Sequence, residues 1–147
     1  MASTLLVRDY MAHQVITVDV SDSVFEATEK LIKNNVGCIV VTEKSELAGI
    51  VTKGDILKNS LLRLRDPVGT NVGLIMTRPF ITIESENSLE EAANLMSEKQ
   101  VSKLPVLQDG LLVGIITATD IMRVEPAYVK YLINLIDSKT SASSKAK

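Results

Sequence analysis

The chain has 147 residues, of which 46% are hydrophobic and 23% charged, and its formal net charge is −2. This composition is typical of one ordinary globular unit, and the charge disfavours a nucleic-acid binder, which needs an excess of positive charge. Cys38 is the only cysteine, so no disulfide can form within the chain and we expect a cytoplasmic location. No apolar run approaches the ~18 residues of a membrane span, so no membrane partner is expected.

The chain repeats itself with an offset of 65 residues. Residues 7–57 align with residues 72–122 without a gap, and 15 of these 51 pairs are identical. A repeat of this kind indicates two copies of one structural unit. A unit of about 65 residues buries a small fraction of its surface, so we expect the two copies to pack into one integrated domain.

Each repeat is predicted to form a strand, a helix, two strands and a second helix. Capping boxes, in which a serine precedes a glutamate by three residues, open the first helices at Ser23 and Ser88. Asp55 and Asp120 lie where the closing helices begin. Short apolar runs with β-branched residues predict the strands, at 15–18, 38–41 and 49–51 in the first repeat and at 80–83, 104–107 and 114–116 in the second.

Two segments lie outside the repeats. Residues 58–71 connect them, beginning as a helix and breaking at Asp66–Gly69. A C-terminal helix is predicted over 126–137, because Pro126 suits a first turn and an apolar stripe follows. This helix either covers its own domain or contacts a second copy of the chain. Residues 138–147 are expected to be disordered. The stripe consists of Tyr128, Val129, Leu132, Ile133 and Ile136.

A homodimer is also expected. Leu61, Leu62, Ile121 and Met122 are predicted to lie on exposed faces of helices. Monomeric proteins rarely leave large apolar patches open to water.

The repeated motifs resemble the CBS-domain family, named from cystathionine β-synthase. The shared features are a methionine followed by Ile-Thr five residues later, the segment Val101–Val106, and the pattern Gly-x-x-Thr-x-x-Asp at Gly49–Asp55 and Gly114–Asp120. The resemblance covers residues 7–122. It implies an α/β fold of two β-α-β-β-α CBS repeats, at 7–57 and 72–122, packed about a pseudo-twofold axis, with the C-terminal helix added.

Members of this family typically bind adenosine compounds in clefts between repeats and often form dimers. The resemblance therefore implies a regulatory module that binds AMP, ADP or ATP, requires no cofactor, and signals to a separate enzyme or transporter. Two alternatives stay open: a ligand-independent interaction or dimerisation module, and a sensor of S-adenosylmethionine.

The segments Thr52–Asp55 and Thr117–Asp120, here called the Thr-Asp loops, are the strongest candidates for ligand binding. Each follows a strand and opens a helix, where free backbone amides favour an anion. The hydroxyl can donate to a phosphate, and the carboxylate can accept from the hydroxyls of a ribose. Thr-x-x-Asp is also an ordinary helix-capping pattern, and the two roles can coexist.

The resemblance assigns two nucleotide sites, and for their aliphatic members plain core packing is the alternative. Site A is expected to be the stronger, because Thr119 offers a hydroxyl where the first repeat has Gly54. Lys103 is the preferred phosphate contact. Site A comprises Met11, Ile16, Val36, Gly37, Ile115, Thr117, Thr119 and Asp120. Site B comprises Met76, Ile81, Val101, Ser102, Ile50, Thr52 and Asp55.

Neither catalysis nor a metal site is expected. His13 is the only histidine, and there is no cysteine pair to complete a metal cluster. The sequence also contains no P-loop and no glycine pattern of a dinucleotide-binding fold.

Overall fold

The computed structural model describes residues 4–78 and 81–135, and these residues form two compact units. Unit 1 contains the described residues up to His13 together with those from Ile81 onward, and unit 2 runs from Gln14. The first residues of each repeat, Val7–His13 and Val72–Arg78, are here called the opening segments. Each opening segment thus belongs to the unit that the other repeat builds. The predictions for Phe80, Ile136 and the C-terminal tail lie outside the described residues.

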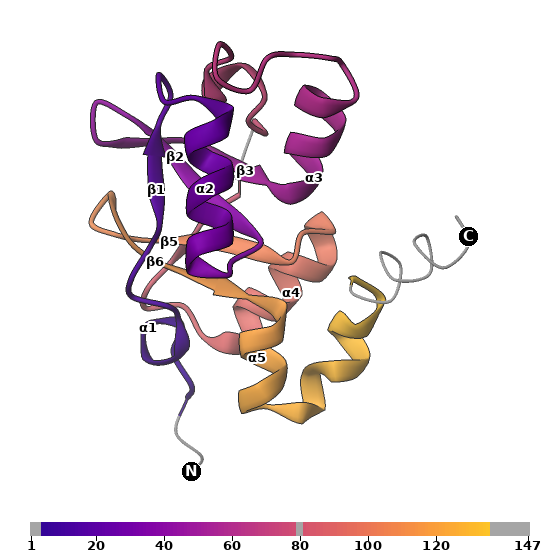
Figure 1. Cartoon of the computed structure of the whole chain (residues 1–147). Coiled ribbons are helices and arrows are strands. Elements are labelled where there is room, and N and C mark those ends of the chain that lie inside the picture. Colours follow the sequence, from indigo (N-terminus) through magenta and orange to yellow (C-terminus); the bar gives the residue numbers. More distant parts are fainter. Residues whose placement is uncertain (1–3, 79–80, 136–147) are drawn as a thin grey trace. The chain divides into compact units, whose positions relative to one another are not determined.

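Unit 2 is a three-stranded sheet of order β1-β2-β3, and α2 connects its two parallel strands (Figure 1). The last strand runs antiparallel to the second, and a β-bulge lies between Val41 and Thr42. A short helix and a π-helical turn then follow the sheet. The elements are β1 (Thr17–Asp19), α2 (Val24–Asn34), β2 (Cys38–Glu43), β3 (Glu46–Thr52), α3 (Lys53–Ile56), η1 (Leu57–Leu61) and η2 (Val72–Leu74).

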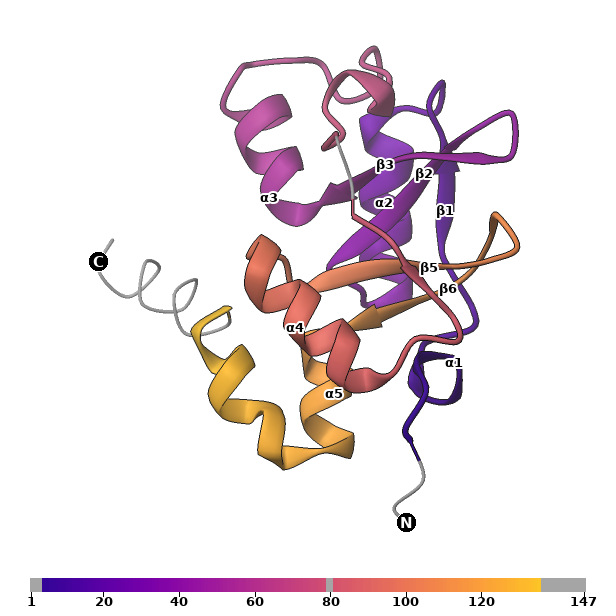
Figure 2. The same ribbon diagram turned by 180° about the vertical axis from the view of Figure 1, so that it is seen from behind.

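Unit 1 repeats this plan, with α4 and α5 covering its sheet (Figure 2). Its sheet has the order β4-β5-β6, and the bulge recurs at the equivalent place, between Val106 and Leu107. The predicted α/β repeat is therefore confirmed in both halves of the chain. The elements are α1 (Val7–Tyr10), β4 (Ile83–Glu84), α4 (Leu89–Lys99), β5 (Lys103–Gln108), β6 (Leu111–Thr117), α5 (Ala118–Val124), η3 (Pro126–Tyr128) and a helical stretch at 129–135.

Each unit has its own hydrophobic core. In unit 2 the core gathers around α2, whose Val24, Ala27 and Leu31 are buried because they recur on one face of the helix. In unit 1 the opening segment contributes Val7, which is fully buried, and Met11.

The C-terminal stretch covers the core of its own unit. Leu132 is fully buried there and Leu135 is 6% exposed, so the first of the two explanations for this helix is supported. Leu135 was not part of the predicted stripe. Tyr131 remains exposed.

Two residues of the expected dimer surface are not exposed, and of these Met122 is partly buried against the core of unit 1. Ile121 is fully buried in the core of unit 1, because it lies on the inner face of α5. The prediction that it forms part of an exposed patch is therefore wrong. Leu61 and Leu62 are exposed, at 63% and 76%, as expected.

The shorter first strand of unit 1 has a cause in the sequence. In unit 2 the amide of Val40 donates to the carbonyl of Ile16, next to the start of β1. The equivalent residue of β5 is Pro105, which has no N–H to donate. β4 therefore pairs with β5 over two residues, whereas β1 pairs with β2 over three.

The two predicted capping boxes differ in detail. At Ser88 the box is complete, since the side chain of Glu91 also accepts from the backbone N–H of Ser88. At Ser23 only half of it forms. The Ser23 hydroxyl accepts from the amide of Glu26 at 3.0 Å, but the Glu26 carboxylate lies near that hydroxyl instead of the backbone N–H.

Two glycines allow the opening segments to approach the sheets. A Cβ at Gly114 would lie 2.5 Å from the sulfur of Met11 and 2.8 Å from the carbonyl oxygen of Ala12. A Cβ at Gly49 would meet Met76 and Thr77 in the same way. Any larger residue would force the opening segment away from the last strand of its sheet.

We expect Gly114→Ala to lower the free energy of unfolding by about 1–3 kcal/mol, the usual cost of overpacking. Gly54→Ala is the matched control. A Cβ at Gly54 would meet only the hydroxyl of Thr52, at 3.6 Å, and alanine favours a helix, so this variant should be neutral or slightly stabilising. Urea denaturation of both variants checks the prediction, and equal stabilities would contradict it.

Candidate functional site

Both Thr-Asp loops form complete capping boxes. In unit 2 the amide of Asp55 donates to the Thr52 hydroxyl at 3.1 Å, and the amide of Thr52 donates to the Asp55 carboxylate at 2.9 Å. In unit 1 the corresponding distances between Thr117 and Asp120 are 3.1 Å and 3.0 Å. The capping role that the sequence offered as an alternative is therefore present in both repeats. Each capping bond uses one carboxylate oxygen, Oδ2.

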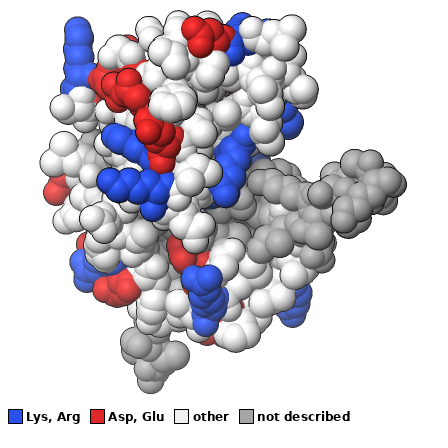
Figure 3. All heavy atoms as spheres, in the orientation of Figure 1, with Lys and Arg blue, Asp and Glu red and all other residues white. Residues whose placement is uncertain are grey.

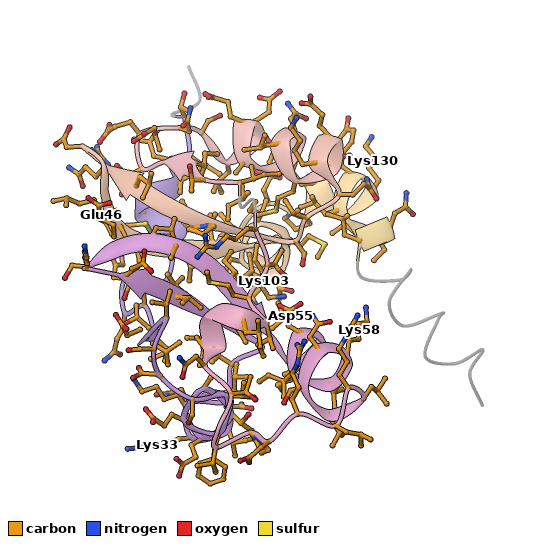
Figure 4. The ribbon with its side chains drawn as sticks, turned by 90° about the horizontal axis from the view of Figure 1, so that it is seen from above. Lys33, Glu46, Asp55, Lys58, Lys103 and Lys130 are labelled. Atoms are coloured by element: carbon orange, nitrogen blue, oxygen red, sulfur yellow. The ribbon has the colours of Figure 1, made fainter. Side chains whose placement is uncertain are left out.

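The two carboxylates differ in what else they bind. The hydroxyl of Thr77 lies 3.1 Å from both oxygens of Asp55 and donates to that carboxylate. Among the described residues, the carboxylate of Asp120 accepts only the capping bond from Thr117. Oδ1 of Asp120 therefore has lone pairs that none of residues 4–78 and 81–135 uses. Asp55 is labelled in Figure 4, where its side chain stands at the start of α3.

Each Thr-Asp loop lies beside the segment that precedes the second strand of its own unit. In unit 2 the amide of Lys53 donates to the carbonyl of Gly37 at 3.2 Å. In unit 1 the amide of Ala118 donates to the carbonyl of Ser102 at 2.8 Å. The structure thus brings Gly37 to the loop of Asp55, and Ser102 to the loop of Asp120.

Lys103 is a basic residue beside the loop of Asp120. It opens β5 and is the cross-strand partner of Thr117, so the two side chains project from the same face of the sheet. Lys103 is half-buried, and its ammonium makes no ion pair with any of residues 4–78 and 81–135. In unit 2 the equivalent residue is Cys38, paired with Thr52. A phosphate contact from Lys103 is thus compatible with the fold of unit 1.

The other residues expected in the sites divide between the units. Met11, Ile115, Thr117, Thr119 and Asp120 lie in unit 1, whereas the remaining members of site A lie in unit 2. Site B divides in the same way, with its Thr-Asp loop and Met76 in unit 2. The combination of residues from both units in one site stays a prediction. The residues assigned to the unit opposite their loop are Ile16, Val36 and Gly37 for site A, and Ile81, Val101 and Ser102 for site B.

Most of the apolar site residues also pack against a core. Met11 is 8% exposed, and it belongs to the core of unit 1. The other members of this group are partly buried against the core of their own unit, so packing accounts for part of each side chain. They are Ile16, Val36 and Met76 in unit 2, and Ile81 and Val101 in unit 1.

The surface charges and the metal-binding side chains bear on other kinds of site. On the face seen in Figure 3, acidic and basic side chains lie in several small groups, and neither sign dominates. Across residues 4–78 and 81–135, no three His, Cys, Asp or Glu side chains gather to hold a metal ion. Within the same residues, no helix has the length and apolar character needed to cross a membrane.

The sequence reasoning missed the importance of Thr77 and of its repeat mate, Ala12. Both immediately follow the repeated methionines and bridge to the last strand of their unit, at Ile50 and Ile115. In the sequence, the two repeats differ at this position, with threonine in one and alanine in the other. The structure shows why the difference matters, because the Thr77 hydroxyl donates to the Asp55 carboxylate.

Comparison with known proteins identifies the fold family. The model of the CBS domain matches residues 7–62 and 71–127. The chain belongs to the CBS-domain family. It carries two tandem copies of the domain, which occupy most of its length. Domain pairs of this family are regulatory modules and often bind ligands.

The CBS pair is similar to both small and large relatives. The chain is 34% identical over 115 residues to the CBS domain-containing protein YhcV of Bacillus subtilis, covering 78% of this chain and 81% of that protein. It is 35% identical over 120 residues to an L-aspartate semialdehyde sulfurtransferase of Methanocaldococcus jannaschii, covering 80% of this chain but only 23% of the enzyme. The match to the enzyme therefore concerns a minor part of its length.

A solved structure adds information on ligands. The CBS domain pair of protein MJ0100, in complex with 5-methylthioadenosine and S-adenosyl-L-methionine, superimposes with a TM-score of 0.76 and 31% sequence identity. The similarity covers 85% of this chain and 98% of that one. Both of those ligands contain an adenosine group.

Proposed function

We propose that this CBS pair senses an adenine nucleotide, AMP, ADP or ATP, and passes its bound state to a partner protein without catalysing a reaction. The observation that carries the proposal is the carboxylate of Asp120. It is fixed by its capping bond through Oδ2, while Oδ1 has no partner among the described residues. A rigid carboxylate with an open oxygen is suited to accept the hydroxyls of a ribose.

The surroundings of Asp120 offer groups that are suited to bind a phosphate. Thr119 is an exposed hydroxyl one residue before the carboxylate, and Lys103 is the cross-strand neighbour of Thr117. An ammonium group and a helix start both favour a phosphate. The complex of the similar MJ0100 domain pair with two adenosine compounds supports an adenosine ligand here.

A second candidate is S-adenosylmethionine or methylthioadenosine, because the domain pair of MJ0100 binds both. These ligands share the ribose, which would use Asp120, but they have no phosphate, so Lys103 would face the carboxylate of S-adenosylmethionine or, with methylthioadenosine, no anion. The other alternative, a ligand-independent interaction module, and the expected homodimer rest on the exposed leucines of η1 and the turn after it. The cytoplasmic location also remains a prediction.

Thermal unfolding in the presence of each ligand tests the proposal. A nucleotide that binds only the folded chain should stabilise it by about 2.7 kcal/mol at a hundredfold excess over its dissociation constant. We further propose that the site recognises the adenine edge, so AMP should raise the melting temperature more than inosine monophosphate.

Isothermal titration with AMP, ATP, S-adenosylmethionine and methylthioadenosine then separates the candidates. Tighter binding of the two ligands without phosphate would favour the second candidate. Equal stabilisation by AMP and inosine monophosphate would remove the adenine-specific part of the proposal. Absence of binding by all four ligands below millimolar concentration would leave the interaction module as the function.

A further inference from the structure

The carboxylates of Asp55 and Asp120 occupy equivalent positions in the two repeats but do not have equivalent partners. Each accepts the capping bond from the amide of its own threonine. Among residues 4–78 and 81–135, a side-chain hydroxyl donates to Asp55, from Thr77 at 3.1 Å, and none donates to Asp120. The difference lies entirely within the units, since Thr77 and Asp55 both belong to unit 2.

The backbone does not explain this difference. Thr77 and Ile50 exchange backbone hydrogen bonds at 2.7 Å and 3.4 Å. Ala12 and Ile115 exchange the same pair of bonds at 2.9 Å and 3.1 Å. Residue 12 therefore occupies in unit 1 the place that residue 77 occupies in unit 2, and only the side chain differs. Alanine has no hydroxyl to donate to Asp120.

We propose that the residue after the repeated methionine sets the ribose affinity of its unit's carboxylate, and that the Thr77 hydroxyl is a built-in competitor for Asp55. This inference rests on the proposed function. A threonine hydroxyl donates to a carboxylate in the same way as a ribose hydroxyl does, so the two compete for the same lone pairs. With Ala12 in place of threonine, Asp120 has no such competitor within the part of the chain that the structure describes.

The size of the effect follows from the exposure of Thr77. Its side chain is exposed, so a displaced hydroxyl can form a hydrogen bond with water instead. A ligand at Asp55 therefore replaces one hydrogen bond rather than leaving a buried donor without a partner. Because both partners of the displaced bond can be solvated, we expect a smaller effect than for a desolvated bond to a charged group, a change in affinity of about threefold to tenfold.

The experiment isolates each carboxylate in turn. In an Asp120→Ala background, isothermal titration with AMP reports on Asp55. There Thr77→Val, which keeps the shape and removes the hydroxyl, should tighten AMP binding by about threefold to tenfold. Thr77→Ser restores a hydroxyl and should return the affinity toward that of the background chain. Circular dichroism confirms that each variant is folded.

The reciprocal change tests the same idea in unit 1. In an Asp55→Ala background, Ala12→Thr should weaken AMP binding by about threefold to tenfold, because it introduces a competing donor. Ala12→Val adds similar volume without a hydroxyl and is the matched control. An equal loss in both variants would show that bulk and not the hydroxyl acts, and would overturn the inference.

The outcomes for the inference and for the proposed function can be told apart. AMP binding by the wild-type chain with no gain in Thr77→Val would overturn the competitor role and leave the nucleotide site in place. Failure of the wild-type chain to bind AMP at all would overturn both. A gain in Thr77→Val together with a loss confined to Ala12→Thr would support the inference.

Discussion

Asp120→Ala is expected to lower the affinity for AMP by about tenfold or more, and to do so more strongly than Asp55→Ala. Hydrogen bonds to a charged group are worth about 1.5–3 kcal/mol each, so even one lost ribose contact accounts for this factor. Asp120 is the carboxylate with an oxygen that no described residue binds, whereas Asp55 already accepts from Thr77. Titration of both variants with AMP measures the difference.

The same two variants should rank in the opposite order for stability. Each loses a capping interaction worth about 0.5–2 kcal/mol. Asp55→Ala loses in addition the bond from Thr77, so it should be the less stable variant in urea denaturation. Asp120→Ala should therefore cause the larger loss of AMP affinity, and Asp55→Ala the larger loss of stability. If both residues had only a structural role, AMP affinity would not differ between the two variants.

Asp120→Asn is the conservative control. An asparagine keeps a carbonyl oxygen that can accept from the amide of Thr117, but it removes the charge that strengthens bonds to ribose. It should preserve most of the stability and lose part of the affinity. Unchanged AMP affinity in both alanine variants would show that the aspartates only cap their helices. Loss of binding in Asp55→Ala alone would reverse the ranking of the sites.

The sequence predicted the elements well because their signals are local. The β-branched runs placed the sheet strands to within a few residues, and Ser88 with Glu91 identified the start of α4. The repeat itself supplied the plan of each unit. The repeats differ at Pro105, which replaces Val40 and has no N–H. This difference explains why β4 pairs with β5 over only two residues.

The sequence could not predict in which unit each opening segment packs. Met11 and Met76 are equivalent, and so are Gly49 and Gly114, so either methionine fits over either glycine by residue type alone. The structure pairs Met11 with Gly114, and Met76 with Gly49, across the repeat boundary. The Thr77–Asp55 bond depends on this exchange, which is why the asymmetry of the two carboxylates was not visible beforehand.

Because of this exchange, the two units are built in the same way. Each unit takes its main elements from one repeat and its opening segment from the other. The opening segment supplies core side chains, such as Val7 in unit 1, and also places residue 12 or 77 beside the last strand. Core packing and the proposed control of ligand affinity therefore depend on the same opening segments.

The exchange predicts that Met11→Ala loosens the second repeat and not the first. Met11 is 8% exposed and packs in the core of unit 1, although it precedes the first repeat's own sheet in the chain. Truncating a buried methionine to alanine costs about 2–5 kcal/mol, because the lost contacts leave a cavity. Hydrogen exchange should become faster in the amides of β5 and β6, while those of β2 and β3 keep their protection.

Two variants make this test specific. Met11→Leu nearly conserves the volume and should cost less than about 1.5 kcal/mol. Met76→Ala should produce the mirror image, with faster exchange in β2 and β3, because Met76 packs against the core of unit 2. Faster exchange in β2 and β3 upon Met11→Ala would contradict the exchanged arrangement, since it would mean that the methionine stabilises the sheet of its own repeat.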